Sequence, residues 1–179
     1  MSEVSRAFIK LAEIAELSRQ HAQGLPAQEE ARVIWSGVGF TLNGRRYVTS
    51  MDEVSEILSV PRYTQVPGVK SWVKGIANVR GRLMPVMDLL GFLNRPSALQ
   101  LKRRRVLAVE RGELYSGLVV DEVLGMQHIP QDTFTQDIPE EYAETRSYLK
   151  GGFASDKGFF AVFSLYELAR DPRFLNVAS

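Results

Sequence analysis

Asp88 and the pair Asp121-Glu122 are the side chains whose type and placement could support acid-base chemistry. Two carboxylates that face each other can share the roles of general acid and general base. Each of these carboxylates, however, follows an apolar segment that predicts a buried strand. Asp at such a strand end commonly accepts hydrogen bonds from nearby backbone N–H groups. We therefore expect Asp88 and Asp121 to be structural, with a paired-carboxylate site as the alternative.

Other groups able to carry out catalysis are scarce. The chain has two histidines and no cysteine, which excludes disulfides, thiolate metal sites and cysteine nucleophiles. His128 is expected on a half-exposed strand. His21 lies near the end of an expected helix, where it complements the helix dipole, and a phosphoacceptor role is its alternative. Neither a Walker loop nor a G-x-S-x-G elbow occurs. We expect no enzyme activity, no metal and no cofactor.

The basic run Lys102-Arg103-Arg104-Arg105 could contact a phosphate backbone. It has no interleaved aromatic residues, and it precedes an expected strand by way of a loop. We expect a solvated junction between loop and strand, and keep a nucleic-acid-binding SH3-like module as the rival. The 22 basic and 21 acidic residues of the chain give no overall field that would attract nucleic acid or an anionic membrane.

Composition is that of an ordinary globular protein. The 179 residues are 45% apolar and 24% charged, enough for one domain or two small ones with a core. No apolar run approaches the ~20 residues that a membrane-spanning helix needs, and the N-terminus does not resemble a signal peptide. We expect a cytoplasmic location.

The segment Val66 to Gly91 predicts one β-hairpin at the centre of the chain. Strand 72–79 alternates in polarity, and strand 83–89 is apolar on both faces, as expected of a strand buried on two sides. Gly81 allows the positive φ of a tight turn, which places Arg80 on a short, rigid corner. A guanidinium there suits a partner's carboxylate. The alternative is that it binds local carbonyls. Pro85 requires a bulge or an exposed edge.

The remaining periodicity predicts a mostly-β protein with peripheral helices, in which small barrels cover the strand edges. Asn43-Gly44 is a strong hairpin signal. An amphipathic helix is expected near the N-terminus, packed on the body of the protein or, alternatively, docked on a partner. The expected elements are helices over 5–22 and 26–31; strands over 35–42, 45–49, 54–60, 105–109, 115–120, 123–129, 148–154 and 159–163; a short helix over 89–93; a long connection over 130–147; and a final helix from Ser164 that stops before Pro172.

The central hairpin resembles the signature of the CheW-like domain family. The matching residues are Gly75 to Gly81, GIANVRG, and Leu83 to Leu89, LMPVMDL. Further landmarks in the same order extend the resemblance over about residues 35 to 170. They are Tyr47, Val54 to Leu58, Val66-Pro67-Gly68, Arg105 to Leu107, Gly117 to Val123, Gly151 to Phe153 and Leu165 to Leu168.

This resemblance implies a fold of two five-stranded SH3-like barrels packed on a shared apolar core. It implies a helical extension over 1–33 and a CheW-like domain over 34–179, with a short C-terminal helix. It also implies a non-enzymatic adaptor that binds the regulatory domain of a CheA-like histidine kinase and the cytoplasmic tip of a methyl-accepting chemoreceptor. Membrane contact would be indirect, through the receptor array. Nucleic acid is not an implied partner.

Within the family, the chain resembles the adaptors of type IV pilus systems, which control twitching motility. The resemblance lies in the helical extension, in segment 24–28 and in the amino-acid sequences of 61–65 and 72–75. A flagellar-type coupling protein is the alternative. The resemblance implies that Arg80, Asn78 and Gly81 form the partner-binding turn. It implies that Gly75, Gly117, Asp88 and Asp121 are structural. Val69-Lys70 departs from the family, where many relatives have a second proline.

Overall fold

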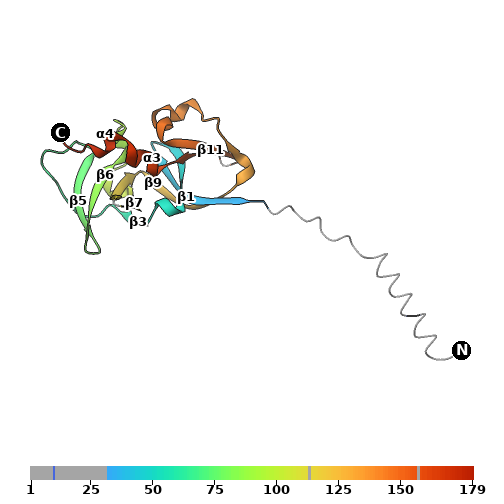
Figure 1. Cartoon of the computed structure of the whole chain (residues 1–179), viewed down its shortest axis with the longest axis horizontal. Helices are drawn as coiled ribbons and strands as arrows, with labels where there is room; N and C mark the ends of the chain where they lie inside the picture. The colour runs from blue at the N-terminus through green and yellow to red at the C-terminus, as the bar shows by residue number, and fades with distance from the viewer. Residues whose placement is uncertain (1–9, 11–31, 113, 157) are drawn as a thin grey trace. The chain divides into compact units, whose positions relative to one another are not determined.

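The structure of the chain is a computed structural model that describes Lys10 and residues 32–112, 114–156 and 158–179 (Figure 1). The chain divides into two units, Met1–Arg32 and Val33–Ser179. The following account concerns the second unit. The two helices expected between residues 5 and 31, and His21 with them, lie outside the described residues.

Two six-stranded, mostly antiparallel sheets make up this unit, so the expected mostly-β fold is confirmed. Sheet A has the order β10-β11-β12-β2-β1-β9, and sheet B has the order β3-β7-β8-β6-β5-β4. The strands of sheet A are β1 (Ile34–Leu42), β2 (Arg45–Ser50), β9 (Glu122–Pro130), β10 (Phe134–Thr135), β11 (Leu149–Ser155) and β12 (Gly158–Phe163). Those of sheet B are β3 (Glu56–Ser59), β4 (Tyr63–Thr64), β5 (Val73–Val79), β6 (Arg82–Asp88), β7 (Arg105–Arg111) and β8 (Leu114–Val120).

Each sheet has one strand more than the five expected, because a two-residue strand, β10 or β4, joins its edge. The helices are short and lie between strands or after them: η1 (Met51–Glu53), α2 (Leu89–Phe92), η2 (Leu101–Arg103), η3 (Gln131–Thr133), η4 (Glu140–Tyr148), α3 (Leu165–Arg170) and α4 (Pro172–Leu175). The helix from Leu165 ends before Pro172, as expected. A second helix follows at once, because Asp171 caps it and Pro172 suits its first turn. The connection over 130–147 is more ordered than expected, since it contains two 3₁₀-helices.

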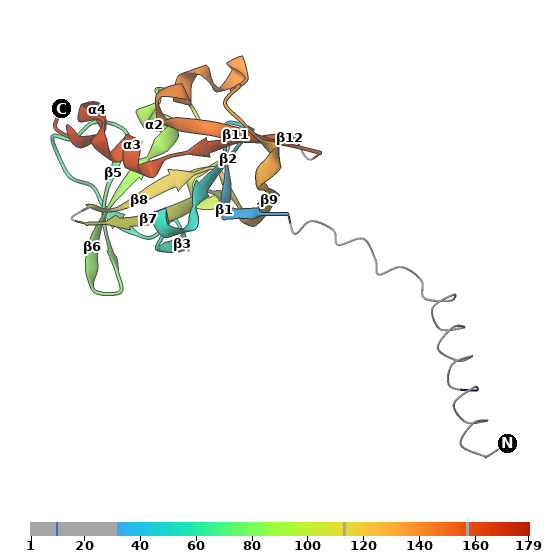
Figure 2. The same cartoon turned by 45° about the vertical axis from the view of Figure 1, so that its right-hand side comes forward.

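The sheets are interleaved in sequence. Sheet A begins with β1 and β2, the chain then builds all of sheet B, and sheet A is completed by β9 to β12 (Figure 2). β12 lies parallel to β2, with Ala161 opposite Tyr47. Because strands far apart in sequence are neighbours, neither sheet A nor the core between the sheets can form from a local segment.

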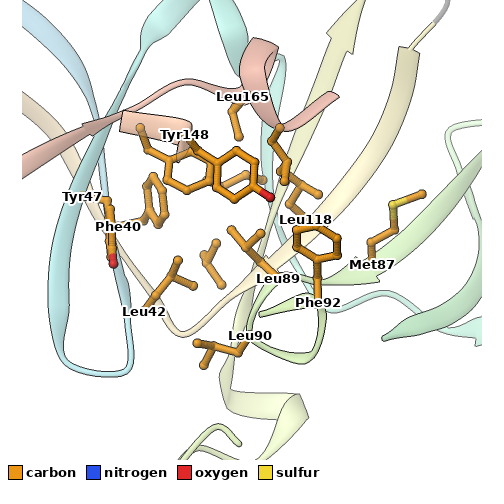
Figure 3. Close-up of a cluster of buried hydrophobic side chains, with 14 of the residues drawn as sticks. Phe40, Leu42, Tyr47, Met87, Leu89, Leu90, Phe92, Leu118, Tyr148 and Leu165 are labelled. Atoms are coloured by element: carbon orange, nitrogen blue, oxygen red, sulfur yellow. The ribbon is translucent and has the colours of Figure 1, made fainter. Parts of the chain in front are cut away.

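A shared apolar core joins the two sheets, as expected. Figure 3 shows Phe40 and Tyr47 of sheet A facing Leu89, Phe92 and Leu118, which come from sheet B and the helix that follows β6. All of these side chains are buried. Two smaller clusters lie within single sheets, one around Met84 and Val106 in sheet B and one around Val48 and Phe153 in sheet A. Two packed barrels with a common core account for this division of the apolar side chains.

Gly75 is required by a close approach between strands. Its φ is 147°, and a Cβ atom at this position would lie 2.1 Å from the carbonyl oxygen of Thr64 in β4. Gly44, in the β1–β2 turn, has a φ of 79° with open space around it. Both glycines have positive φ, but only Gly75 has a neighbouring backbone atom in the space that a Cβ would occupy.

We predict that Gly75→Ala lowers the free energy of unfolding by clearly more than Gly44→Ala does, because the β4–β5 pairing must also open and a φ of 147° suits only glycine. Gly44→Ala should lose about 1–2 kcal/mol, the cost of a left-handed alanine with no steric contact. Urea unfolding of both variants would measure the difference. Equal losses would contradict the role of the β4 contact.

Candidate partner-binding surfaces

A two-residue turn at the tip of the β5–β6 hairpin presents Arg80. Val79 pairs with Arg82, and the two residues between them have positive φ values, 53° for Arg80 and 82° for Gly81. This is the geometry of a type I′ turn, whose twist matches that of the strands. The Oδ1 atom of Asn78 accepts a hydrogen bond from the backbone N–H of Gly81 at 2.8 Å. The turn is therefore fixed by local interactions alone.

The Arg80 guanidinium is exposed and oriented. Its Nη2 atom donates to Oε1 of Glu56 in β3 at 2.5 Å, and its side chain remains 79% exposed. The guanidinium therefore binds a carboxylate across the sheet rather than a local carbonyl. An exposed pair of this kind contributes at most ~1 kcal/mol to stability. The pair therefore sets the direction of the guanidinium more than it stabilises the fold.

Exposed apolar side chains lie on the outer face of the same hairpin. Asn78 pairs with Leu83, and Ile76 pairs with Pro85, so the four share a face. Leu83 is 69% exposed and Ile76 is 37% exposed. The expectation that the return strand is buried on both sides from Leu83 onward was wrong at its start. β8 pairs with β6 only from Val86 on, which leaves the first half of β6 as an open edge that also tolerates Pro85.

Arg82, on the other side of the turn, is held within the protein's own surface. Its two Nη atoms donate to the two carboxylate oxygens of Glu110, each at 2.9 Å, and its guanidinium lies 3.9 Å from the centre of the Tyr115 ring. The hydrogen bonds from Arg82 hold the pKa of the Glu110 carboxyl below its usual range. Of the two arginines at this turn, Arg80 is the one presented outward.

Asp88 and Asp121 come together through a buried arginine. Arg104 donates from Nη1 to Oδ2 of Asp88 at 3.0 Å and from Nη2 to Oδ1 at 2.8 Å. Its Nε lies 3.2 Å from Oδ1 of Asp121, an ion pair without hydrogen-bond alignment. Each carboxylate also accepts from a backbone N–H, that of Gly91 for Asp88 and that of Asn43 for Asp121. The carboxylates are thus neutralised by a cation and do not face each other as an acid-base pair.

The solvated junction expected at residues 102–105 was wrong for Arg104, which is 2% exposed. The alternation of side chains along a strand could have indicated this burial, because Arg104 falls on the same strand face as the buried residues Val106 and Ala108. Burial raises the pKa of Asp88, but the hydrogen bonds and charge of Arg104 outweigh it and hold that pKa below its usual value. Arg104 therefore keeps a buried carboxylate ionised.

Gly117 lies in β8 against the apolar cluster of sheet B that contains Met84 and Val106. A Cβ atom there would lie 2.7 Å from Cε of Met84 and 2.8 Å from Cγ1 of Val106. The absence of a side chain thus lets two buried neighbours approach the strand. Within residues 32–112, 114–156 and 158–179, no group of His, Asp or Glu is arranged to hold a metal ion. None of the described helices has the length and apolar character needed to cross a bilayer.

A second surface feature, which sequence reasoning missed, is a cavity of about 260 Å³ between η1, β7 and α3. The carboxylate of Glu53 accepts hydrogen bonds from the backbone N–H of Leu165 at 2.7 Å and from Thr49 Oγ1 at 3.2 Å, which brings η1 against α3. Ser50 and Glu53 have the spacing of a capping box, but the Ser50 side chain makes no capping hydrogen bond to η1. The cavity is lined by Glu53, Val109, Gly112, Leu165, Tyr166, Ala169 and Arg170. No sequence signal marks it, because its walls come from three distant segments.

Comparison with known proteins agrees with this geometry. Residues 36–173 match the family model of the CheW-like domain. The chain is 50% identical over 178 residues to Protein PilI of Pseudomonas aeruginosa, covering 99% of both chains. It is 34% identical over 83 residues to Chemotaxis protein CheW of Bacillus subtilis, covering 46% of this chain and 53% of that protein. The fold is similar to that of scaffolding protein TtCheW from Thermoanaerobacter tengcongensis, with a TM-score of 0.65 at 22% identity over 78% of this chain and 95% of the other.

We predict that Arg104→Met lowers the free energy of unfolding by about 3–5 kcal/mol near neutral pH, because both buried carboxylates lose the guanidinium and Asp88 keeps only the ammonium of Lys74, 3.5 Å away. In the wild type, the contribution of Asp88 is present above its usual pKa of 3.8 and is lost as the pH falls through its lower folded pKa. In the variant, Arg104 no longer outweighs the effect of burial, so the pKa of folded Asp88 rises. The loss of unfolding free energy relative to the wild type should therefore be smaller at lower pH.

Urea unfolding of both proteins at about pH 7 and about pH 5 measures this change. Arg103→Met, at the exposed neighbouring arginine, is the matched control and should have little effect. A deficit of the same size at both pH values would show that lost packing, not uncompensated charge, explains the Arg104 result.

Proposed function

The chain belongs to the CheW-like domain family, and we propose on that premise that it is a non-enzymatic adaptor coupling a methyl-accepting chemoreceptor to a CheA-like histidine kinase. The observation that carries this proposal is the projecting β5–β6 hairpin, which presents an oriented cation beside exposed apolar side chains. Identity of 50% to Protein PilI along the whole chain favours a pathway that controls type IV pilus twitching motility over a flagellar one. In this role the protein acts in the cytoplasm and is held at the inner face of the membrane through the receptor.

An adaptor needs two surfaces that partners can occupy at once. The first is the hairpin surface, made of Ile76, Asn78, Arg80 and Leu83, whose apolar centre and charged rim match the anatomy of protein interfaces. The second is the cavity between η1, β7 and α3. A stable interface would bury ~1,200–2,000 Å², and a transient one less.

Regulation by such a protein requires no reaction. If the adaptor binds one conformation of the kinase tenfold better than another, it shifts the kinase equilibrium by ~1.4 kcal/mol. A receptor that changes the geometry of the bound adaptor then changes kinase activity through that difference. The side chains that matter are accordingly those that differ in contact between the two kinase states.

A nucleic-acid-binding module is the less supported alternative. Burial of Arg104 between two aspartates removes the centre of the basic run and leaves Lys102, Arg103 and Arg105 exposed. Three cations in a run without interleaved aromatic residues provide few phosphate contacts. A mobility-shift assay at low salt with the purified chain tests this alternative, and we expect no shift.

The adaptor proposal is tested by a pull-down of the full chain with the purified kinase regulatory domain and with the signalling tip of the receptor. We expect the chain to bind each partner separately and both together. Failure to bind either one would refute the proposal. Competition between the two partners for one surface would refute simultaneous coupling.

We predict that Arg80→Ala weakens binding to one of the two partners by at least tenfold, which corresponds to ~1.4 kcal/mol, since the partner loses a preoriented cation. Because the Arg80–Glu56 pair is exposed, the melting temperature should fall by no more than about 2–4 °C. Titration calorimetry and thermal unfolding provide the two measurements.

Arg62→Ala is the control for Arg80, since Arg62 is also exposed but lies outside the hairpin surface. It should leave the affinity for both partners unchanged. A large drop in melting temperature for Arg80→Ala, with affinity intact, would assign Arg80 a structural role instead.

A further inference from the structure

A polar pocket lies at the opposite end of β5 from Arg80. Its volume is about 340 Å³, and its walls come from three segments: the loop before β5, the end of α2 with the residues after it, and α4 near the C-terminus. In both views α4 lies at the top of sheet B while the hairpin tip points down (Figures 1 and 2). The lining residues are Lys70, Ser71, Trp72, Phe92, Asn94 and Arg173. The pocket is therefore distinct from the hairpin surface and from the cavity beside α3.

Three side chains in this pocket have donors that are not engaged. Within the described part of the chain, the ammonium of Lys70, the hydroxyl of Ser71 and the amide of Asn94 make no hydrogen bond or ion pair. Asn94 is held with a φ of 56°, and its backbone N–H donates to the carbonyl of Gly91 at 3.1 Å. No carboxylate lines the pocket. Its free groups are consequently dominated by hydrogen-bond donors.

Arg173 completes the donor set in a fixed orientation. Its Nε and Nη2 atoms bind the carboxylate of Asp171, and Nη2 also donates to the hydroxyl oxygen of Tyr148 at 2.8 Å. Its guanidinium lies 5.7 Å from the centre of the Phe92 ring. These contacts leave the Nη1 donors available. Because Asp171 balances the charge of Arg173, the net positive charge of the pocket comes from Lys70.

The apolar wall of the pocket is aromatic and rigid. Trp72 and Phe92 are buried, and their rings meet edge to face with centroids 5.3 Å apart. Phe174 stacks on Trp72 from behind at 5.6 Å. Only a small part of this wall is open to a ligand, since Trp72 is 6% and Phe92 is 9% exposed, but the rings need no reordering when a planar group contacts that part.

We propose that this pocket binds a phosphate monoester carried on a planar ring. A phosphate group has three strong acceptor oxygens directed to different sides, which matches four donors placed on three separate segments. A carboxylate has two oxygens in one plane and would engage fewer of them. The pocket volume falls within the range of small-molecule sites, and only part of it is needed for the phosphate. The aromatic wall takes the ring.

The test is an NMR titration of the full chain labelled with ¹⁵N, with phenyl phosphate as the probe. The indole N–H of Trp72 and the amides of Ser71 and Asn94 should shift in a saturable manner, with a dissociation constant on the order of 1 mM or below. The indole of Trp35, packed on Phe153, should not move. Inorganic phosphate should bind at least threefold more weakly, because it lacks the ring.

Two variants assign the binding to this pocket. Lys70→Ala removes the net charge, and Asn94→Gly removes the amide while keeping a residue that accepts a positive φ. Each should weaken phenyl phosphate at least fivefold with an unchanged melting temperature. Lys102→Ala, which removes an exposed lysine elsewhere, is the matched control and should bind as the wild type does.

A further titration compares phenyl phosphate with phosphotyrosine in a short peptide, to distinguish a free small ester from a modified protein as the natural ligand. Tenfold tighter binding of the peptide would point to a modified protein partner, and equal binding to a free small ester. Absence of saturable shifts, wild-type affinity in Lys70→Ala, or tighter binding of benzoate than of phenyl phosphate would overturn the proposal. None of these outcomes depends on kinase or receptor binding.

Discussion

The ion-pair network of Asp88, Arg104 and Asp121 is the constraint on which the geometry of both sheets depends. These residues stand at the end of β6, just before β7 and just after β8, so one buried guanidinium fixes the ends of three adjacent strands of sheet B. Asp121 also accepts from the backbone N–H of Asn43 in the β1–β2 turn, which connects the network to sheet A. A buried charge tolerates little displacement of its partners. The base of the hairpin that presents Arg80 is thereby held.

The aromatic core supplies the second connection between the sheets. Phe40 stacks on Tyr47, and both meet the ring of Phe163, all within sheet A. Tyr148 links this group to Phe92 on the sheet B side. Rigid rings packed in this way transmit displacement rather than absorb it. A body built on them suits a protein that acts by holding two partners in a defined relative geometry.

Local chemistry explains what the sequence could predict, and tertiary contacts explain what it could not. The turn at Arg80 follows from Asn78 and Gly81, which lie within three residues of each other. The exposure of Leu83 depends on where β8 stops pairing, a property of a strand thirty residues later. Burial of Arg104 depends on Asp88 and Asp121, although strand alternation alone could have suggested it. The cavity beside α3 and the donor pocket near Lys70 require segments that only the folded chain brings together.

The interleaved order of the sheets has a consequence for synthesis on the ribosome. All strands of sheet B lie in one continuous stretch, from Glu56 to Val120, so that sheet can form while the chain is still growing. β1 and β2 emerge earlier, yet β2 obtains its parallel neighbour β12 only when residues 158–163 have left the exit tunnel. Until then, β2 exposes an edge that ends at Ser50. Nascent chains are accordingly most exposed to mispairing in their oldest part, and a product truncated before β12 would leave this edge of β2 unpaired.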